Sequence, residues 1–323
     1  MRKLLAITWA AAMGVSTVGV VSTAQATASS AGLASASGQV STYAGHRFRQ
    51  IATGGSHACG LTTAGGVYCW GAGFAGQLGN GGTADSSVPT PVRGLSGGVA
   101  ALGAGGNTSC AVTTAGALKC WGYNNLGQVG DGRHTCIALT TGAVRCWGVN
   151  EYGQLGDGTE TDRLTPTRVT GLPSPVAGVA PGNDHTCART TSGTAVCWGA
   201  NYSGQLGDGT YVEHYAPAPV PGLTRGVVDI RAGNFTTCAE TADGRLQCWG
   251  DDSYGALGNG AAGGWSRPSQ VVGITAGVLS IDGGYLFTCA VDSSGVGKCW
   301  GLNDNGELGN GSMQDSTVPV TVR

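Results

Sequence analysis

Charged residues are scarce in this sequence. Lys, Arg, Asp and Glu make up only 11% of its 323 residues, against the usual quarter or so in soluble domains. The formal net charge is −2, so the chain lacks the basic surface that favours nucleic acids or anionic membranes. Glycine is abundant, with 60 copies, but shows no three-residue period, which excludes collagen.

After the N-terminus, no stretch is long and apolar enough to span a bilayer. The chain begins with Met-Arg-Lys, continues with an apolar run to Val21 and then reaches a small-x-small motif that ends at Ala26. This pattern is typical of a cleaved signal peptide. We therefore expect residues 1–26 to be removed on export, residues 27–43 to form a flexible linker, and residues 44–323 to fold.

The sequence has no odd cysteine. Its twelve cysteines form six pairs with a spacing of ten residues, and Trp-Gly follows each pair: Cys59 with Cys69, Cys110 with Cys120, Cys136 with Cys146, Cys187 with Cys197, Cys238 with Cys248, and Cys289 with Cys299. The tryptophans recur at steps of 51, 26, 51, 51 and 51 residues. A period near 50 predicts a repeat architecture. Paired cysteines in an exported chain predict disulfides formed in an oxidising compartment.

The spacing of the cysteines also predicts how they pair. In one repeat, Val176–Val179 predicts a first strand, and two more strands flank the turn at Ser192, which predicts a β-hairpin. Residues opposed across this hairpin include Cys187 and Cys197, whose Cα atoms are then roughly 4.5–5.5 Å apart. A disulfide needs about 4.4–6.8 Å. We therefore expect six bridges, each inside one hairpin.

Two other positions recur in the repeats. A glycine precedes the first cysteine by five residues, which predicts a backbone conformation or a packing distance that a Cβ would spoil: Gly54, Gly105, Gly182, Gly233 and Gly284. A proline follows the tryptophan by nineteen residues, and because proline is confined to edge strands or strand starts, it predicts the opening of a strand that feeds the next unit: Pro89, Pro166, Pro217, Pro268 and Pro319.

The motifs do not favour a metal or a cofactor. Structural zinc sites usually have two to four residues between paired cysteines, and the histidines near the cysteines (His57, His134, His185) are replaced elsewhere by Thr108, Thr236 and Phe287. The Gly-x-Leu-Gly-Asp-Gly segments lack the Gly-Lys-Ser/Thr ending of a phosphate loop. The Asp/Asn-rich stretches lack the downstream Glu of a calcium loop. We expect no metal and no cofactor, and a structural role for these loops.

The segment Trp-Gly-Ala-Asn-Tyr-Ser-Gly-Gln-Leu-Gly-Asp-Gly (residues 198–209), with the proline strand and the Gly-x-x-His-x-Cys segment, resembles the regulator of chromosome condensation (RCC1) repeat. The resemblance covers nearly all of residues 44–323 and implies a β-propeller of four-stranded blades. The paired cysteines are similar to those of Crinkly4-type receptor kinases, and the export signal to secreted bacterial β-lactamase inhibitors. The eukaryotic founder binds chromatin and acts as a nucleotide exchange factor for Ran; this chain departs from it by its export signal and lack of a basic tail.

The short step between Trp121 and Trp147 means that about 25 residues are missing. They correspond to a proline strand and the strand after it. We therefore expect about six blades, with the unit near 131–158, built on Cys136 and Trp147, reduced to two strands. We also expect the C-terminal strand, Val318–Arg323, to enter the first blade and close the ring.

The expected function is binding without catalysis. No Ser/His/Asp or Cys/His set stands outside the repeats, and every cysteine belongs to a pair. We expect a secreted monomer that binds an extracellular protein, as an inhibitor or regulator, and neither nucleic acid nor membrane. Cell-wall carbohydrate is the alternative ligand, and exchange-factor activity rests on family analogy alone.

Candidate contact residues are aromatic residues and one histidine in or beside the variable loops, since aromatic residues anchor many interfaces. They are Trp265, Tyr211, His214, Phe74, Tyr152, Tyr202 and Tyr254. The last four fall close to one repeat position, so packing between loops is the alternative role for them.

Overall fold

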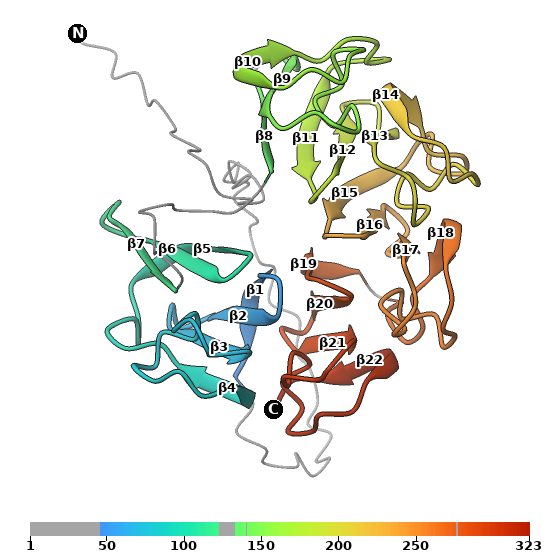
Figure 1. Cartoon of the computed structure of the whole chain (residues 1–323). Coiled ribbons are helices and arrows are strands. Elements are labelled where there is room, and N and C mark those ends of the chain that lie inside the picture. The colour runs from blue at the N-terminus through green and yellow to red at the C-terminus, as the bar shows by residue number, and fades with distance from the viewer. Residues whose placement is uncertain (1–45, 123–132, 140, 276) are drawn as a thin grey trace, which may run out of the picture.

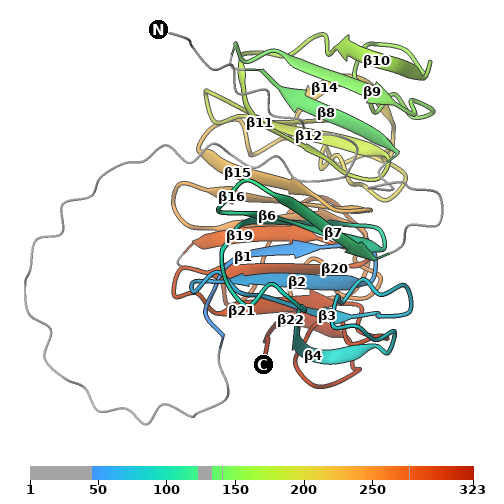
Figure 2. The same ribbon diagram turned by 90° about the vertical axis from the view of Figure 1, so that its left-hand side faces the viewer.

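The computed structural model describes residues 46–122, 133–139, 141–275 and 277–323. These residues form twenty-two β-strands and no helix, so they contain no helix that could cross a membrane. Six antiparallel sheets are arranged around a common centre as the blades of a propeller (Figure 1). The strands run across the thickness of the ring, so the loops gather at its two faces (Figure 2). The predicted all-β propeller of about six blades is confirmed.

Four blades have four strands each, ordered from the centre to the rim. The first blade contains β1 (Phe48–Thr53), β2 (His57–Thr62), β3 (Val67–Gly71) and β4 (Ser86–Pro91). The fourth contains β11 (Val176–Pro181), β12 (His185–Thr190), β13 (Ala195–Gly199) and β14 (His214–Pro219). The fifth contains β15 (Val227–Ala232), β16 (Thr236–Thr241), β17 (Leu246–Gly250) and β18 (Trp265–Gln270). The sixth contains β19 (Val278–Gly283), β20 (Phe287–Asp292), β21 (Gly297–Gly301) and β22 (Ser316–Thr321).

The other two blades have three described strands each. The second contains β5 (Val99–Gly105), β6 (Thr108–Thr113) and β7 (Leu118–Gly122), and the third contains β8 (His134–Ala138), β9 (Val144–Gly148) and β10 (Arg163–Arg168). Among the described residues, the second blade thus has no outer strand and the third has no inner strand. The prediction of one two-stranded unit at 131–158 is wrong, because the missing residues cover the end of one blade and the start of the next.

The C-terminal strand does not enter the first blade. β22 pairs with β21 in the sixth blade, and β4 is already the outer strand of the first blade. The predicted role of Val318–Arg323 as a strand of the first blade is therefore wrong, since each proline strand completes the blade that precedes it in the chain. The sixth and first blades instead pack face to face, with Phe48, Trp70 and Val322 in one apolar cluster.

All six cysteine pairs form disulfides inside their hairpins, as predicted. The two cysteines of each pair are register partners in adjacent antiparallel strands, and their Cα atoms are 4.1 or 4.2 Å apart. This separation is slightly shorter than the expected range. All twelve thiols are oxidised, so none of them can be a zinc ligand. The bridges join Cys59 to Cys69, Cys110 to Cys120, Cys136 to Cys146, Cys187 to Cys197, Cys238 to Cys248, and Cys289 to Cys299.

The recurring prolines lie in the outer strands β4, β10, β14, β18 and β22, where a missing N–H costs no ladder bond. Each of these strands completes the blade before it, so the prediction that they feed the next unit is wrong. The recurring glycines have the predicted packing role. At Gly54, an added Cβ would lie 2.2 Å from the His57 ring, and Gly182 has the same relation to His185. These glycines are needed for close packing of a ring against the backbone.

Each tryptophan in a described contact links its blade to the preceding one. The indole Nε1–H of Trp198 donates to the carbonyl oxygen of Gln154 at 2.9 Å. The same bond, at 2.8 or 2.9 Å, joins Trp70, Trp121, Trp249 and Trp300 to Glu307, Gln77, Gln205 and Ala256 respectively. Since a buried indole N–H needs an acceptor, this bond fixes how neighbouring blades meet.

The Gly-Gln-Leu-Gly loops are held by their own side chains. In the fourth blade, Asn201 Oδ1 accepts from the backbone N–H of Leu206, and Asn201 Nδ2 donates to the carbonyls of Thr210 and Val212. Asn150 and Asn303 make the equivalent bonds in the third and sixth blades. These contacts support the structural interpretation of the loops.

The Cys110–Cys120 disulfide should be the first to open when the folded protein is treated with a small thiol. Cys120 is exposed, whereas every other cysteine is at most 3% exposed. Because exchange requires a thiolate to reach a sulfur atom, brief reduction and alkylation should label Cys110 and Cys120 at least about tenfold faster than the other cysteines. Peptide mapping by mass spectrometry measures this. In denaturant, the six pairs should react alike; preferential labelling of another pair in the folded protein would contradict the prediction.

Candidate binding site

One face of the propeller collects two kinds of loop. In an antiparallel sheet, the loop between the first and second strands and the loop between the third and fourth strands lie at the same end. We call this end of the propeller the loop face. It carries the β11–β12 and β13–β14 loops of the fourth blade and their equivalents in the other blades.

Backbone hydrogen bonds join the inner loops of four consecutive blades on this face. The N–H of Asn234 donates to Gly284 O at 3.2 Å, that of Tyr285 to Gly55 O at 2.9 Å, and that of Gly55 to Gly106 O at 2.7 Å. Loops from the fifth, sixth, first and second blades therefore hold one another in place. A ligand on this face would meet a largely preformed surface.

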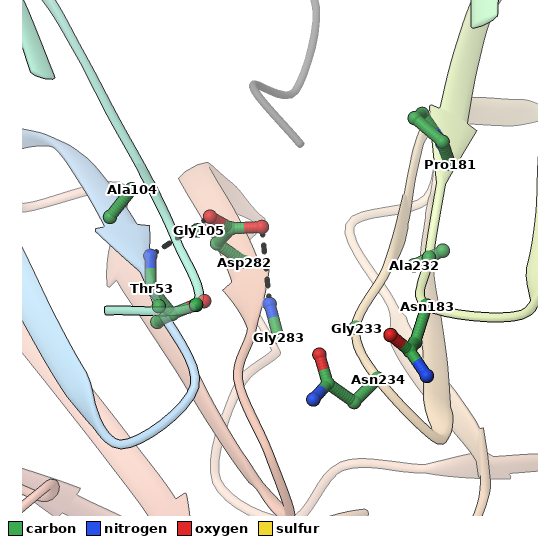
Figure 3. A pocket seen from close by; sticks show the side chains of 13 residues that line it. Thr53, Ala104, Gly105, Pro181, Asn183, Ala232, Gly233, Asn234, Asp282 and Gly283 are labelled. Atoms are coloured by element: carbon green, nitrogen blue, oxygen red, sulfur yellow. Dashed lines mark hydrogen bonds between the residues drawn. The ribbon is translucent and has the colours of Figure 1, made fainter. Parts of the chain in front are cut away.

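A pocket opens on the axis between these loops. Its walls are the last residues of the inner strands and the loops that follow them: residues 53–54, 104–106, 181–183, 232–234 and 282–283. Asp282 lies in the wall, with its carboxylate accepting from the N–H groups of Thr53 at 3.0 Å and Gly283 at 3.2 Å. The side chain of Asn183 lines the opposite wall, and that of Asn234 lies between Asp282 and Asn183 (Figure 3). Burial raises the pKa of Asp282 to about 6.

Four aromatic rings form a continuous row beside this pocket. The ring of Tyr202 is 5.9 Å from that of Tyr152 and 6.0 Å from that of Phe235, and Phe235 is 5.4 Å from Tyr285. All three contacts are edge-to-face, a favourable geometry for aromatic pairs. Tyr202 and Tyr285 nevertheless remain 44% and 42% exposed. The row crosses the third, fourth, fifth and sixth blades, and we call it the aromatic row.

A charged cluster lies at one end of the aromatic row. Arg133 bonds both Asp184 and Glu151 at 2.8 Å, and the hydroxyl of Tyr202 donates to Asp184 at 3.2 Å. Burial, followed by the charge of Asp184, raises the pKa of Tyr202, which keeps its hydroxyl protonated. Asn183 Nδ2 also donates to Asp184, at 2.8 Å. This cluster therefore connects the aromatic row to the pocket wall.

The structure brings only some of the sequence candidates together. Tyr152 and Tyr202 belong to the aromatic row. Phe74 and Tyr254, near the same repeat position, are exposed in their own loops. Tyr211 is exposed in the β13–β14 loop.

The remaining two candidates lie at the start of outer strands. His214 Nε2 is 3.0 Å from Asp208 Oδ2. Arg163 and Asp157 form the equivalent pair in the third blade, so His214 contacts the Asp of its own loop as Arg163 does. Trp265 is the first residue of β18 and its backbone pairs with Gly250; its side chain lies outside the described part of the structure.

Several residues of the site were missed by sequence reasoning. Phe235 and Tyr285 come from the loops after inner strands, whereas the sequence candidates lie in or beside the loops that precede the outer strands. Asp282 occupies a position held by Ala180 and Ala52 in other blades. The detectable signal was this departure from the repeat pattern.

Leu286, beside Tyr285, has a φ of 88°, a conformation that costs a non-glycine residue on the order of 1–3 kcal/mol.

The three repeated histidines are part of the packing between blades. His57, His134 and His185 are buried, and each Nε2 lies 2.6–2.9 Å from the hydroxyl of Ser109, Thr186 or Thr237 in the next blade. Those hydroxyls donate to the carbonyls of Gln77, Gln154 and Gln205. Each hydroxyl has one proton, so each histidine must donate from Nε2. Each Nδ1 is buried with no hydrogen-bond partner in the described part of the structure, so a second proton there would be unfavourable and the rings are neutral. Burial lowers the pKa of His57 and His134 to about 4 and that of His185 to about 3.

The fold and the site define the class of this protein: a disulfide-bonded six-bladed β-propeller with a preformed loop face. Models of the regulator of chromosome condensation (RCC1) repeat match residues 64–112, 141–189 and 192–239, and a second model of that repeat matches residues 48–77, 99–128, 176–205 and 227–256. The chain belongs to the RCC1 repeat family, as the sequence resemblance predicted.

Known proteins show the same relationship. The chain is 32% identical over 282 residues to the ultraviolet-B receptor UVR8 of Arabidopsis thaliana, covering 86% of this chain and 58% of UVR8. It is 32% identical over 278 residues to the human E3 ubiquitin-protein ligase HERC2, covering 84% of this chain but 5% of HERC2. The Saccharomyces cerevisiae propeller Prp20p is similar in structure, with a TM-score of 0.56, 23% identity and coverage of 84% of this chain and 76% of Prp20p.

The buried histidines should make the protein less stable in mild acid. Their pKa values in the folded state lie below the ordinary value of 6.5, so the unfolded chain binds more protons than the folded one between about pH 6.5 and 4. The stability that they contribute is complete above pH 6.5 and is lost as the pH falls through the folded values. Replacing His57, His134 and His185 by Phe, the residue at position 287, should flatten this slope.

Urea unfolding at pH 7.0, 5.5 and 4.5 measures the effect. Each histidine is expected to contribute about 1.4 kcal/mol per unit of pKa shift. Asp252 and Asp282, whose pKa values burial raises to about 6, have the opposite pH dependence. Both proteins contain them, so they cancel in the difference. Equal slopes for wild type and triple variant would contradict the prediction.

Proposed function

We propose that this protein is an exported, non-enzymatic binding propeller whose loop face binds an extracellular protein. The single observation that carries the proposal is the aromatic row, four rings in contact across four blades with two of them more than 40% exposed. Aromatic side chains dominate the energetic centres of protein interfaces. Tyrosine suits such a site because it offers a large apolar surface together with a hydroxyl.

The rigidity of the loop face supports this proposal. The inner loops are joined by backbone hydrogen bonds, and the Gly-Gln-Leu-Gly loops are held by Asn150, Asn201 and Asn303. A preformed surface loses little conformational entropy on binding. The strained φ of Leu286 lies next to Tyr285, and such strain tends to occur at functional sites.

The relatives support protein binding in general. The yeast propeller Prp20p binds Gsp1p and histones, which favours a protein partner for a propeller of this fold. The chain spans about 58% of UVR8 and a small part of HERC2, so the receptor and ligase activities of those proteins are not part of the proposal. Exchange-factor activity has no support beyond the family relationship.

Export is the second part of the proposal. Six disulfides favour an oxidising compartment, and the first 26 residues have the pattern of a secretory signal peptide. The mature protein would begin at Thr27 and act as a monomer. A carbohydrate of the cell wall is the second candidate ligand, because exposed tyrosines in a row also suit sugar rings.

The double substitution Tyr202→Ser with Tyr285→Ser should abolish partner binding. Removing both exposed rings interrupts the aromatic row and should weaken affinity at least about a hundredfold, as loss of central aromatic residues does at other interfaces. The experiment is affinity capture from the culture medium with the mature protein, followed by titration of the captured partner. A glycan array tests the carbohydrate alternative.

Leu164→Ser is the matched control. Leu164 is an apolar residue on the outer strand β10 and is 95% exposed, so its loss should leave both binding and thermal stability unchanged. The proposal would be overturned if the Tyr202/Tyr285 variant, with an unchanged melting temperature, kept full affinity. Binding of glycans and of no protein would replace it with the second candidate.

A further inference from the structure

The polar pocket on the propeller axis includes in its wall Gly54 and Gly182, the glycines that pack against His57 and His185. We propose that it receives the guanidinium group of one arginine side chain, presented by the protein partner that covers the loop face. This inference rests on the proposed protein-binding function and adds the chemistry of one contact. It is supported by the acceptors around the pocket, the charge of its wall and its size.

The pocket wall presents oxygen acceptors from three blades. Asp282 is fixed at one side by the backbone N–H groups of Thr53 and Gly283. On the other side, Asn183 donates its Nδ2–H to Asp184 at 2.8 Å, which turns its oxygen toward the pocket (Figure 3). Asn234 lies between them. A guanidinium group has five N–H donors in one plane, so it can bond to acceptors on both sides at once.

The charges around the pocket favour a cation. On the inner strands, Arg231 and Asp229 of β15 form an ion pair at 3.2 Å. The charges of this pair sum to zero, so the carboxylate of Asp282 gives the three side chains a net negative charge. Arg231 also lies close enough to lower the pKa of Asp282, although burial is the larger effect and raises it. At the rim, Arg133 is shared between the two carboxylates of Asp184 and Glu151. These groups together carry more negative than positive charge.

The size of the pocket fits one side-chain head. Its volume is about 90 Å³, whereas pockets for drug-sized ligands are usually about 300–1,000 Å³. The pocket lies beside the aromatic row, because Asn234 in its wall precedes Phe235 and Gly283 lies two residues before Tyr285. One partner could therefore cover the aromatic row with apolar residues and insert an arginine on the axis.

N-acetyl-arginine amide, a probe that carries only the side-chain charge, tests this site. Amide chemical shifts in NMR spectra should change saturably at Thr53 and Gly283, whose N–H groups bond Asp282. The neutral citrulline analogue should cause no change. Asp282→Asn should weaken binding of the probe at least tenfold. Asn234→Asp, which places a second carboxylate in the pocket wall, should strengthen it severalfold.

Asp304→Asn is the matched control. Asp304 is an exposed carboxylate of the same blade and is absent from the pocket wall, so its removal changes the net charge equally and should leave binding of the probe unchanged. Equal affinity for wild type, Asp282→Asn and Asn234→Asp would overturn the inference. So would equal losses in Asp282→Asn and Asp304→Asn, because that result means attraction to net charge alone.

The captured protein partner separates this inference from the proposed function. If the partner is lost with the Tyr202/Tyr285 variant but binds Asp282→Asn as tightly as wild type, the proposed function holds and the arginine site is wrong. If the arginine probe binds in the pocket while no protein binds the loop face, the site holds and the proposed function is wrong.

Discussion

The propeller depends on one backbone carbonyl in each Gly-Gln-Leu-Gly loop. In three blades this carbonyl, at Gln77, Gln154 or Gln205, accepts both the indole N–H of the next tryptophan and the hydroxyl of the residue before the next first cysteine. Ala256 does the same toward the sixth blade. A buried carbonyl has two lone pairs, and this arrangement uses both of them between blades. The loop, the tryptophan and the disulfide hairpin therefore act as one unit, which explains why they recur together in the sequence.

The same carbonyl determines the state of the histidines. Since the hydroxyl donates to the carbonyl, it can only accept from His57, His134 or His185, which fixes a proton on Nε2; burial of the unpartnered Nδ1 keeps the ring neutral. The repeat position tolerates Phe287 because the ring, and not its charge, fills the space above the glycine at position 284. Sequence comparison within the chain showed that histidine was dispensable there. It did not show that the ring bonds the next blade, because that contact joins residues about fifty positions apart.

The sequence predicted most of what repeats and little that does not. The spacing of the recurring residues predicted the period, the hairpins, the disulfide partners and the packing glycines. A fixed offset puts the same residue in the same place in successive blades. The missing residues were assigned to a single blade because no residue pattern in the chain indicates where one blade ends. The proline strand was therefore interpreted as part of the next unit, although it completes the blade before it. The binding site was found in part: Tyr152 and Tyr202 share a repeat position, whereas Phe235, Tyr285 and Asp282 are departures from it.

The deletion also shapes the site. Five blades contribute to the wall of the axial pocket, and among the described residues the third blade contributes none, since it has no inner strand there. At this blade the loop face instead presents Arg133 with its two carboxylates and Tyr152, the first ring of the aromatic row. A complete sixth wall would make the axis symmetric and place another glycine loop beside Asn183. The loss of about 25 residues therefore makes one side of the ring chemically distinct, and that side is where the charged cluster, the row and the pocket meet.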